Sequence, residues 1–177
     1  MLLKNVKASW LFIKNSDDNG NYRVTFEVNE KQDAEILKIL DDVVKQKGVG
    51  SIQECDWQGS RLVDNSTKVV TYTAKCSETF KSKKGEEISR SLPVYDIKAI
   101  KLDKDKIPYV ANGAIINITV EPYFAEYKKK KGAMLGLRSI QLLQYTEYEG
   151  DNPFEDESGE DNPFKPSNTS NDDDIFE

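Results

Sequence analysis

Tyrosines and lysines gather near one end of a hairpin predicted between residues 114 and 145. Residues 116–120 alternate aliphatic and polar side chains, which predicts a strand with one buried and one polar face. If the alternation continues, Tyr123 and Tyr127 lie on the polar face, and a run of lysines, 128–131, follows at the turn. Exposed rings beside ammonium groups suit a single-stranded nucleic acid, because each base offers a flat π surface and each nucleotide carries a phosphate charge.

The same residues also fit a purely structural role. Aromatic residues are common in strands because they cover a half-buried pleated surface, and lysine-rich turns keep sheet edges soluble. A second predicted hairpin shows the same combination, since Phe80 ends a strand and Lys81, Lys83 and Lys84 follow in its turn. The repetition favours nucleic-acid binding over the structural explanation.

The charge of the chain is divided between two regions. The 177 residues carry a net charge of −6, which alone argues against a nucleic-acid partner. Residues 149–177 hold 11 Asp and Glu and one cation, Lys165, whereas residues 1–148 hold 24 Lys and Arg against 20 Asp and Glu. A basic domain of net +4 therefore precedes an acidic tail of net −10. We predict that the tail is disordered, because it has few aliphatic side chains to bury.

The composition argues against an enzyme, a membrane protein and a secreted protein. The sequence has no histidine, which removes the commonest general base and metal ligand, and it has no glycine-rich phosphate loop. It shows neither an apolar run of about 18 residues nor a secretion leader. Cys55 and Cys76 lack metal-ligand spacing and fit packing roles, although a disulfide between them stays open. We expect a cytosolic binding protein that needs no metal or cofactor.

Alternating side chains predict an antiparallel hairpin from residues 6–15 and 22–28, joined by a turn rich in Asp, Asn and Gly. Phe12 and Phe26 are expected to pack in the core. Trp10, predicted on the same strand face as Phe12, is a candidate for stacking on a base.

A change of period predicts one helix over residues 31–47, capped by Asn29. A long strand over 67–81 and a return strand over 88–95 follow, whereas residues 51–66 show no clear pattern. The count is about six mostly antiparallel strands, with the helix between the second and the third. Closure removes exposed strand edges, so we predict an all-β oligonucleotide-binding (OB) barrel with one inserted helix, and a β-sandwich is the alternative.

The acidic tail carries two features beyond its charge. The tetrapeptide DNPF occurs twice, at residues 151–154 and 161–164. The last residues place a hydrophobic pair after three acids: Asp172, Asp173, Asp174, Ile175 and Phe176. Such an end can steer toward a basic partner and insert its hydrophobic pair into a pocket, or occupy the basic groove of its own domain.

The basic barrel, the helix after the second strand and the acidic tail with its aromatic end together resemble the single-stranded-DNA-binding proteins of podovirus-type bacteriophages. The likeness is closest over residues 112–142, where a glycine turn, a strand, a VPY-like triplet ending at Tyr123, a loop and a return strand follow one another. The resemblance implies an OB-fold that binds single strands and promotes annealing during DNA replication, recombination and repair. It also implies a phage polymerase and a helicase-primase as partners in the cytoplasm of the infected bacterial host.

By the same resemblance, Tyr123 matches the stacking tyrosine of the family and Phe176 matches its carboxy-terminal aromatic residue. Two positions depart from the pattern: Phe176 is penultimate, and Ser77 stands where an aromatic residue is expected. The second departure means that a base platform is missing or is supplied by Phe80 or Tyr72.

We predict a protein, not an enzyme, that coats single-stranded DNA without sequence preference. The predicted DNA-binding residues are Tyr123, Tyr127, Lys128, Lys129, Lys130, Lys131, Arg138, Lys81, Lys83, Lys84, Phe80, Tyr72 and Trp10, with Trp57 as a further stacking candidate. The alternative is an interaction adaptor or DNA mimic whose acidic tail is the functional surface. The sequence leaves open whether the ligand is DNA or RNA. It also leaves open whether the protein forms a homodimer through the tail.

Overall fold

The computed structural model describes residues 1–82 and 84–147. The predicted acidic tail, 149–177, therefore lies outside the described residues. The strands are β1 (Leu2–Phe12), β2 (Asn21–Val28), β3 (Trp57–Gln58), β4 (Leu62–Val63), β5 (Val70–Ser77), β6 (Thr79–Lys81), β7 (Glu87–Ser89), β8 (Val94–Tyr95), β9 (Ala114–Tyr127) and β10 (Lys130–Gln144). The helix α1 (Glu30–Lys45) and two 3₁₀ turns, Ile52–Glu54 and Lys104–Lys106, complete the set.

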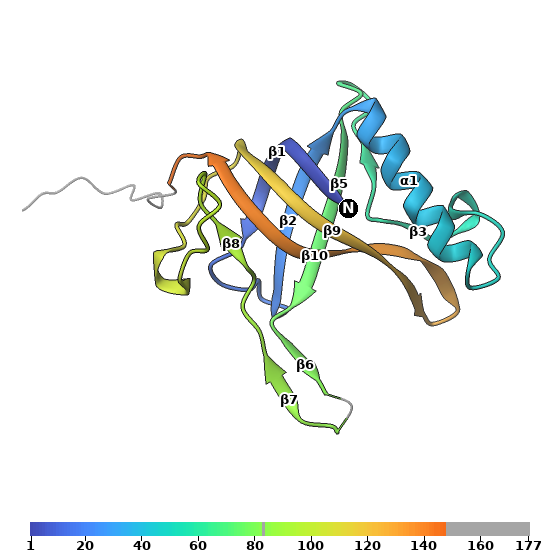
Figure 1. Cartoon of the computed structure of the whole chain (residues 1–177). Coiled ribbons are helices and arrows are strands. Elements are labelled where there is room, and N and C mark those ends of the chain that lie inside the picture. The colour runs from blue at the N-terminus through green and yellow to red at the C-terminus, as the bar shows by residue number, and fades with distance from the viewer. Residues whose placement is uncertain (83, 148–177) are drawn as a thin grey trace, which may run out of the picture.

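Five strands close into a barrel. The order β10-β9-β1-β2-β5 is antiparallel throughout, and β5 then pairs with β10 in parallel through Leu135 opposite Ala74. Figure 1 shows these strands wrapped around a common interior. Closure of this kind is the OB architecture, so the predicted fold class is confirmed.

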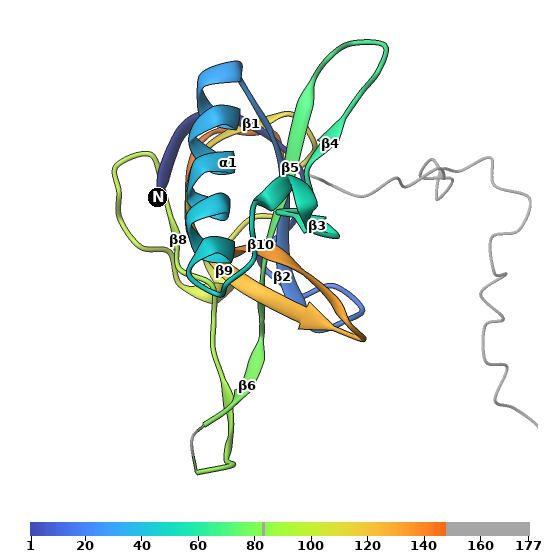
Figure 2. The ribbon, with the colours of Figure 1, turned by 90° about the vertical axis from the view of Figure 1, so that its right-hand side faces the viewer.

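The helix α1 lies across one end of the barrel, as Figure 2 shows from the helix side. Its start is fixed by Asn29, whose side chain accepts from the backbone N–H of Gln32 at 2.9 Å while the Gln32 amide oxygen accepts from Asn29 N–H at 3.0 Å. Ile36, Leu40 and Val44 are buried, at spacings of four residues. The predicted helix and its cap are therefore confirmed.

The core follows the period-two pattern of the strands. Val24, Phe26, Tyr72 and Ala74 are fully buried, on the inner faces of β2 and β5. On β9 the alternation also holds, with the aliphatic residues at 116, 118 and 120 buried and the residues between them partly exposed. No helix among the described residues is long and apolar enough to cross a membrane.

The end of β1 departs from the predicted alternation. Trp10 has a positive φ of 52°, and the pairing with β2 shifts register between Ser9 and Phe12. This bulge turns Trp10 out to solvent, 61% exposed, and brings Ile13 into the core in its place. Phe12 is only partly buried, so its predicted core position is wrong, because the bulge moves it off the inner face.

The region after β5 also differs from the prediction. The predicted long strand ends at Ser77, and β6 and β7 form a separate two-stranded ribbon that projects from the barrel (Figure 1). Backbone N–H of Arg90 donates to the carbonyl of Glu78 at 2.8 Å and closes the base of this ribbon. The predicted return strand is split, because β8 leaves the ribbon and pairs in parallel with β10.

Candidate nucleic-acid interface

A shallow groove crosses the outer face of β1, β2, β5 and β10. It consists of three adjoining hollows that share residues, Arg23 and Thr73 at one junction and Asn21 and Lys75 at the other. The aromatic and cationic side chains that line this barrel groove are Trp10, Arg23, Lys75, Arg90, Tyr123 and Arg138. The outer face of the second and third barrel strands is where OB-folds bind oligonucleotides, and here those strands are β2 and β5.

Two cations of the barrel groove are brought together by strand pairing. Arg23 of β2 lies directly opposite Lys75 of β5 in the antiparallel register. Arg23 Nη1 is 3.7 Å from a carboxylate oxygen of Asp17, and its guanidinium lies 4.9 Å from the ring centre of Phe12. Lys75 is exposed, and among residues 1–82 and 84–147 no carboxylate oxygen lies within 4 Å of its ammonium group. A ligand phosphate can therefore approach Lys75 directly.

Arg138 is directed outward by a bulge in β10. The pairing with β9 shifts register between Leu137 and Ser139, so Arg138 has no direct partner across the hairpin. Its guanidinium forms an ion pair with Glu121, and both side chains are more than half exposed. Exposed ion pairs of this kind contribute only about 0–1 kcal/mol, so a phosphate can compete with Glu121 for Arg138.

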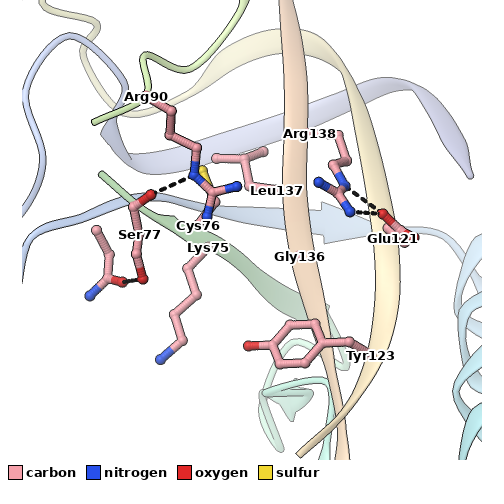
Figure 3. A pocket seen from close by; sticks show the side chains of 10 residues that line it. Lys75, Cys76, Ser77, Arg90, Glu121, Tyr123, Gly136, Leu137 and Arg138 are labelled. Carbon is pink, nitrogen blue, oxygen red and sulfur yellow. Dashed lines mark hydrogen bonds and ion pairs between the residues drawn. The ribbon is translucent and has the colours of Figure 1, made fainter. Parts of the chain in front are cut away.

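Tyr123 lies beside these cations with its ring partly open to solvent, 41% exposed (Figure 3). Burial of the remaining surface raises the pKa of its hydroxyl above the ordinary value. The ring lies over Gly136 of β10, where an added Cβ would sit 3.6 Å and 3.7 Å from two ring carbons. These are ordinary van der Waals distances, so the ring packs against the strand at Gly136.

Arg90 closes the groove at the base of the β6–β7 ribbon. Its Nε donates to the carbonyl of Ser77 at 2.7 Å, and its guanidinium lies 5.1 Å from the ring centre of Phe80 (Figure 3 shows the first contact). The contact with the Phe80 ring is a cation–π interaction. Arg90 is exposed, so its remaining N–H donors face solvent at the end of the barrel groove.

The remaining predicted residues of the long hairpin lie outside the groove. Tyr127 is 62% exposed at the tip, with the Lys128 ammonium 5.1 Å from its ring centre. Lys128 and Lys129 form a two-residue turn with positive φ of 47° and 69°, and Lys130 and Lys131 start β10. Figure 1 shows this tip extending beyond the barrel. The structure thus gathers these five residues on one projection, apart from Lys75 and Arg138.

The second predicted basic turn lies on the β6–β7 ribbon. Phe80 is 42% exposed, and Lys81 and Lys84 are exposed beside it. Lys83 lies outside the described residues. The β6–β7 ribbon and the tip of the β9–β10 hairpin both project from the barrel (Figure 1). Arg90, next to the ribbon, and Tyr123, on the hairpin, line the same hollow.

Tyr72 is wrongly predicted as a base platform. Its side chain is fully buried on the inner face of β5, under α1. Its hydroxyl donates to Asp33 Oδ1 at 2.6 Å, and the Asp33 carboxylate is also held by Arg61 at 2.9 Å and 2.7 Å. Burial raises the pKa of Tyr72, and the hydrogen bond from Arg61 lowers the pKa of Asp33. The alternation along β5 places residue 72 inward with Ala74, so no face of its ring is free.

Sequence reasoning missed Arg23, Lys75 and Arg90. A signal was present for two of them, because Arg23 and Lys75 occupy polar positions of their alternating strands. Their proximity depends on the register between β2 and β5, which strand patterns alone do not give. Trp57 is partly buried where β3 pairs with β10. Cys55 and Cys76 are free thiols, and the described part of the chain shows no group of Cys, Asp and Glu suited to a metal ion.

Comparison with known proteins finds the same architecture in bacteriophage proteins. No protein-family model and no curated protein matches the sequence. The crystal structure of gp2.5, a single-stranded DNA binding protein encoded by bacteriophage T7, matches with a TM-score of 0.63 and 20% identity, over 90% of this chain and 97% of that chain.

The single-stranded DNA-binding protein from bacteriophage Enc34 matches with a TM-score of 0.58 and 15% identity, over 87% of this chain and 86% of that chain. The same protein in complex with single-stranded DNA matches with a TM-score of 0.58 and 16% identity, over 84% and 88% of the two chains. At these identities the likeness is one of fold. This chain therefore shares the fold of bacteriophage single-stranded-DNA-binding proteins, as its sequence resemblance implied.

Proposed function

We propose that this protein binds single-stranded DNA without sequence preference and has no enzymatic activity. The observation that carries the proposal is the barrel groove, where the half-open ring of Tyr123 lines one hollow with Lys75 and Arg138, and Arg23 lines the adjoining hollow. The shared fold supports it, because one structural neighbour is described in complex with single-stranded DNA.

Binding in this groove combines two interactions. Bases stack on Tyr123 at one end and on Trp10 at the other, and each such stack contributes about 1–3 kcal/mol. Phosphates of the DNA approach Lys75, Arg23 and Arg138, and the counterions bound to those phosphates are released. The affinity for DNA therefore falls as the salt concentration rises. Both interactions are available to every nucleotide, which explains binding without sequence preference.

The two projections extend the same surface. The tip of the β9–β10 hairpin offers Tyr127 and the lysines 128–131, and the β6–β7 ribbon offers Phe80, Lys81 and Lys84. Because residues next to each projection, Arg90 and Tyr123, line the same end of the groove, a strand longer than the groove can contact one or both projections. We assign them to the continuation of the DNA path rather than to its centre.

The wider role follows the resemblance. We propose that the protein coats single strands in phage DNA replication, recombination and repair, and promotes their annealing in the host cytoplasm. The acidic end, Asp172 to Phe176, would recruit a polymerase and a helicase-primase through its charge and its hydrophobic pair. In the absence of DNA the same acids compete for the groove cations at high effective concentration.

The first test is a titration of the full chain with oligothymidine, followed by tryptophan fluorescence. We expect saturable quenching, because Trp10 lines the groove and is mostly exposed. A parallel titration with a chain that lacks residues 149–177 should show tighter binding, since the competing acids are gone. Absence of binding by both chains would favour the adaptor alternative, and weaker binding by the truncated chain would contradict competition by the tail.

A further inference from the structure

An apolar pocket adjoins the barrel groove at Trp10, which lines both. Its volume is about 550 Å³, and it is formed by the end of β1 with the loop that follows and by residues 108–112. The residues that shape it are Trp10, Phe12, Ile13, Lys14, Tyr109 and Val110. Trp10 and Tyr109 are 61% and 52% exposed, so two aromatic rings at this pocket are open to solvent. A pocket of this size and apolar character accepts an aromatic side chain.

The described chain ends beside this pocket. Backbone N–H of Ala111 donates to the carbonyl of Thr146 at 2.9 Å, and Val110 forms an antiparallel bridge with Glu147. Val110 and Ala111 also line the pocket. The segment that begins at residue 148 is therefore tethered at the pocket wall, and its local concentration there is high.

The first DNPF tetrapeptide, 151–154, follows closely in the sequence. Phe154 is seven residues beyond Glu147. Seven residues span at most roughly 25 Å when extended and roughly 15 Å on average when flexible. Phe154 can therefore return to a pocket whose wall is hydrogen-bonded to residues 146 and 147. Pro153 restricts the backbone before the ring and lowers the entropy lost on docking.

The charges around the pocket and around Phe154 are complementary. Lys14 lines the pocket, with its ammonium group 4.8 Å from the ring centre of Tyr109. Asp151, Glu155 and Asp156 flank Phe154. We propose that the segment 151–154 docks in cis, with the Phe154 ring in this pocket and the neighbouring acids facing Lys14.

The second DNPF tetrapeptide, 161–164, is a weaker competitor for the same pocket. Phe164 lies 17 residues beyond Glu147 against seven for Phe154. Effective concentration falls with about the −3/2 power of linker length, so the nearer copy is favoured roughly fourfold. In this proposal the first copy of the repeat docks most of the time, and the second copy docks when the first does not. The terminal aromatic residue, Phe176, is then available to bind another surface.

Docking would connect the tail to the barrel groove through Trp10. The side chain lines both the apolar pocket and the hollow that contains Arg23 and Thr73. A ring placed in the pocket covers one side of Trp10 and limits its motion. The proposal thus assigns a role to a repeat that DNA binding itself does not use.

The test uses the full chain with Trp57→Phe, so that Trp10 is the one remaining tryptophan of the two in the sequence. In this background we compare Phe154→Ala, Phe164→Ala, the double variant and, as matched control, Phe176→Ala. The readouts are acrylamide quenching of Trp10 and the NMR methyl resonances of Ile13 and Val110. Phe154→Ala should raise quenching and move both methyl resonances most of the way to the double variant. Phe164→Ala should change little, and Phe176→Ala nothing.

Three results would overturn the proposal. Identical resonances in the parent and the double variant would show that neither ring enters the pocket. If only Phe176→Ala changes the quenching and the methyl resonances, the terminal aromatic residue is the one that occupies the pocket. Loss of the parent signals on dilution would show that a second copy supplies the ring. The affinity for oligothymidine, measured on the same variants, tests DNA binding separately, so the two proposals can fail independently.

Discussion

Tyr72 and Tyr123 sit in opposite environments of one small barrel. At the covered end, under α1, Tyr72 is buried and its hydroxyl is satisfied by Asp33, which Arg61 also holds. In the barrel groove, Tyr123 is half-open and its neighbour Lys75 has no acidic partner within 4 Å in the described part of the chain. The same kinds of side chain therefore serve stability at one end and, in the function proposed above, ligand binding on the other face.

The difference follows from whether the protein itself satisfies the polar groups. A buried hydroxyl or carboxylate must find partners, and once it has them its removal is costly. An exposed cation remains hydrated, so the absence of a partner costs it little free energy. Such a cation also contributes little to the free energy of unfolding. We therefore expect substitutions at the covered end to change stability and substitutions in the groove to change affinity.

The largest effect is expected from Asp33→Ala. The substitution leaves the Tyr72 hydroxyl and the Arg61 guanidinium without their acceptor, which should cost about 2–3 kcal/mol of the free energy of unfolding. Urea denaturation followed by circular dichroism measures the loss. Asp33→Asn, which keeps an acceptor for Tyr72, is the matched control and should lose less. Equal stability of all three proteins would show that this network is not a stabilising one.

The pH dependence of stability sharpens the same point. The pKa of Asp33 is lowered in the fold, so its stabilisation is complete above the unfolded pKa of about 3.9 and is lost as pH falls through the lower folded value. Stability of the parent should therefore drop on acidification below about pH 4, and that of Asp33→Asn should drop less. Parallel stability curves for the two proteins would contradict the pairing of Asp33 with Arg61.

Tyr123→Ala should lower the affinity for DNA and leave the stability of the fold nearly unchanged. Loss of the ring removes one stack, so oligothymidine affinity should fall by about 1–3 kcal/mol while the free energy of unfolding changes little. Tyr123→Phe keeps the π surface and should bind nearly as well as the parent. Fluorescence titration measures the affinities. If Tyr123→Ala unfolds the protein and leaves affinity unchanged, Tyr123 belongs to the core and the contrast with Tyr72 fails.

A smaller effect is expected when the ring is displaced rather than removed. Gly136→Val places methyl groups against the Tyr123 ring and beside the carbonyl of Glu121, which would lie 3.2 Å from the new Cβ. The larger side chain should push the ring away from the strand, so we expect affinity to fall by about 1 kcal/mol through a less favourable stacking position. Gly136→Val combined with Tyr123→Ala should bind no worse than Tyr123→Ala alone. Additive losses would mean that the glycine acts on something other than the ring.

Local patterns in the sequence predicted much of the fold. Asn29 and the apolar spacing of α1 are local signals, and the alternation of residues 116–120 fixed which face of β9 is buried. The bulge at Trp10 was missed, because a positive φ in a non-glycine residue arises from pairing with neighbouring strands. The projecting β6–β7 ribbon was missed for the same reason, since the break after Ser77 depends on contacts of Glu78 and Arg90.

The candidate site was predictable only in part. Tyr123 and Arg138 were identified from one hairpin, whose two strands are adjacent in the sequence. Arg23 and Lys75 become neighbours through a register between strands about 50 residues apart, which a single sequence does not specify. Tyr72 shows the reverse error: an aromatic residue in a strand could face either side of the sheet, and the partly buried Asp33 that accepts its hydrogen bond lies on a helix, 39 residues away in the sequence.

The central claim is that the groove cations bind phosphate, and the most direct test is the salt dependence of oligothymidine affinity. We compare the parent with Lys75→Gln/Arg138→Gln and with Lys31→Gln/Lys38→Gln, a charge-matched control on the exposed side of α1. The parent should lose affinity steeply with salt, and the groove variant should show a slope shallower by about 1.4, since each phosphate contact contributes about 0.7. The control should keep the slope of the parent. A parent affinity independent of salt, or a slope that changes only in the helix control, would contradict the account.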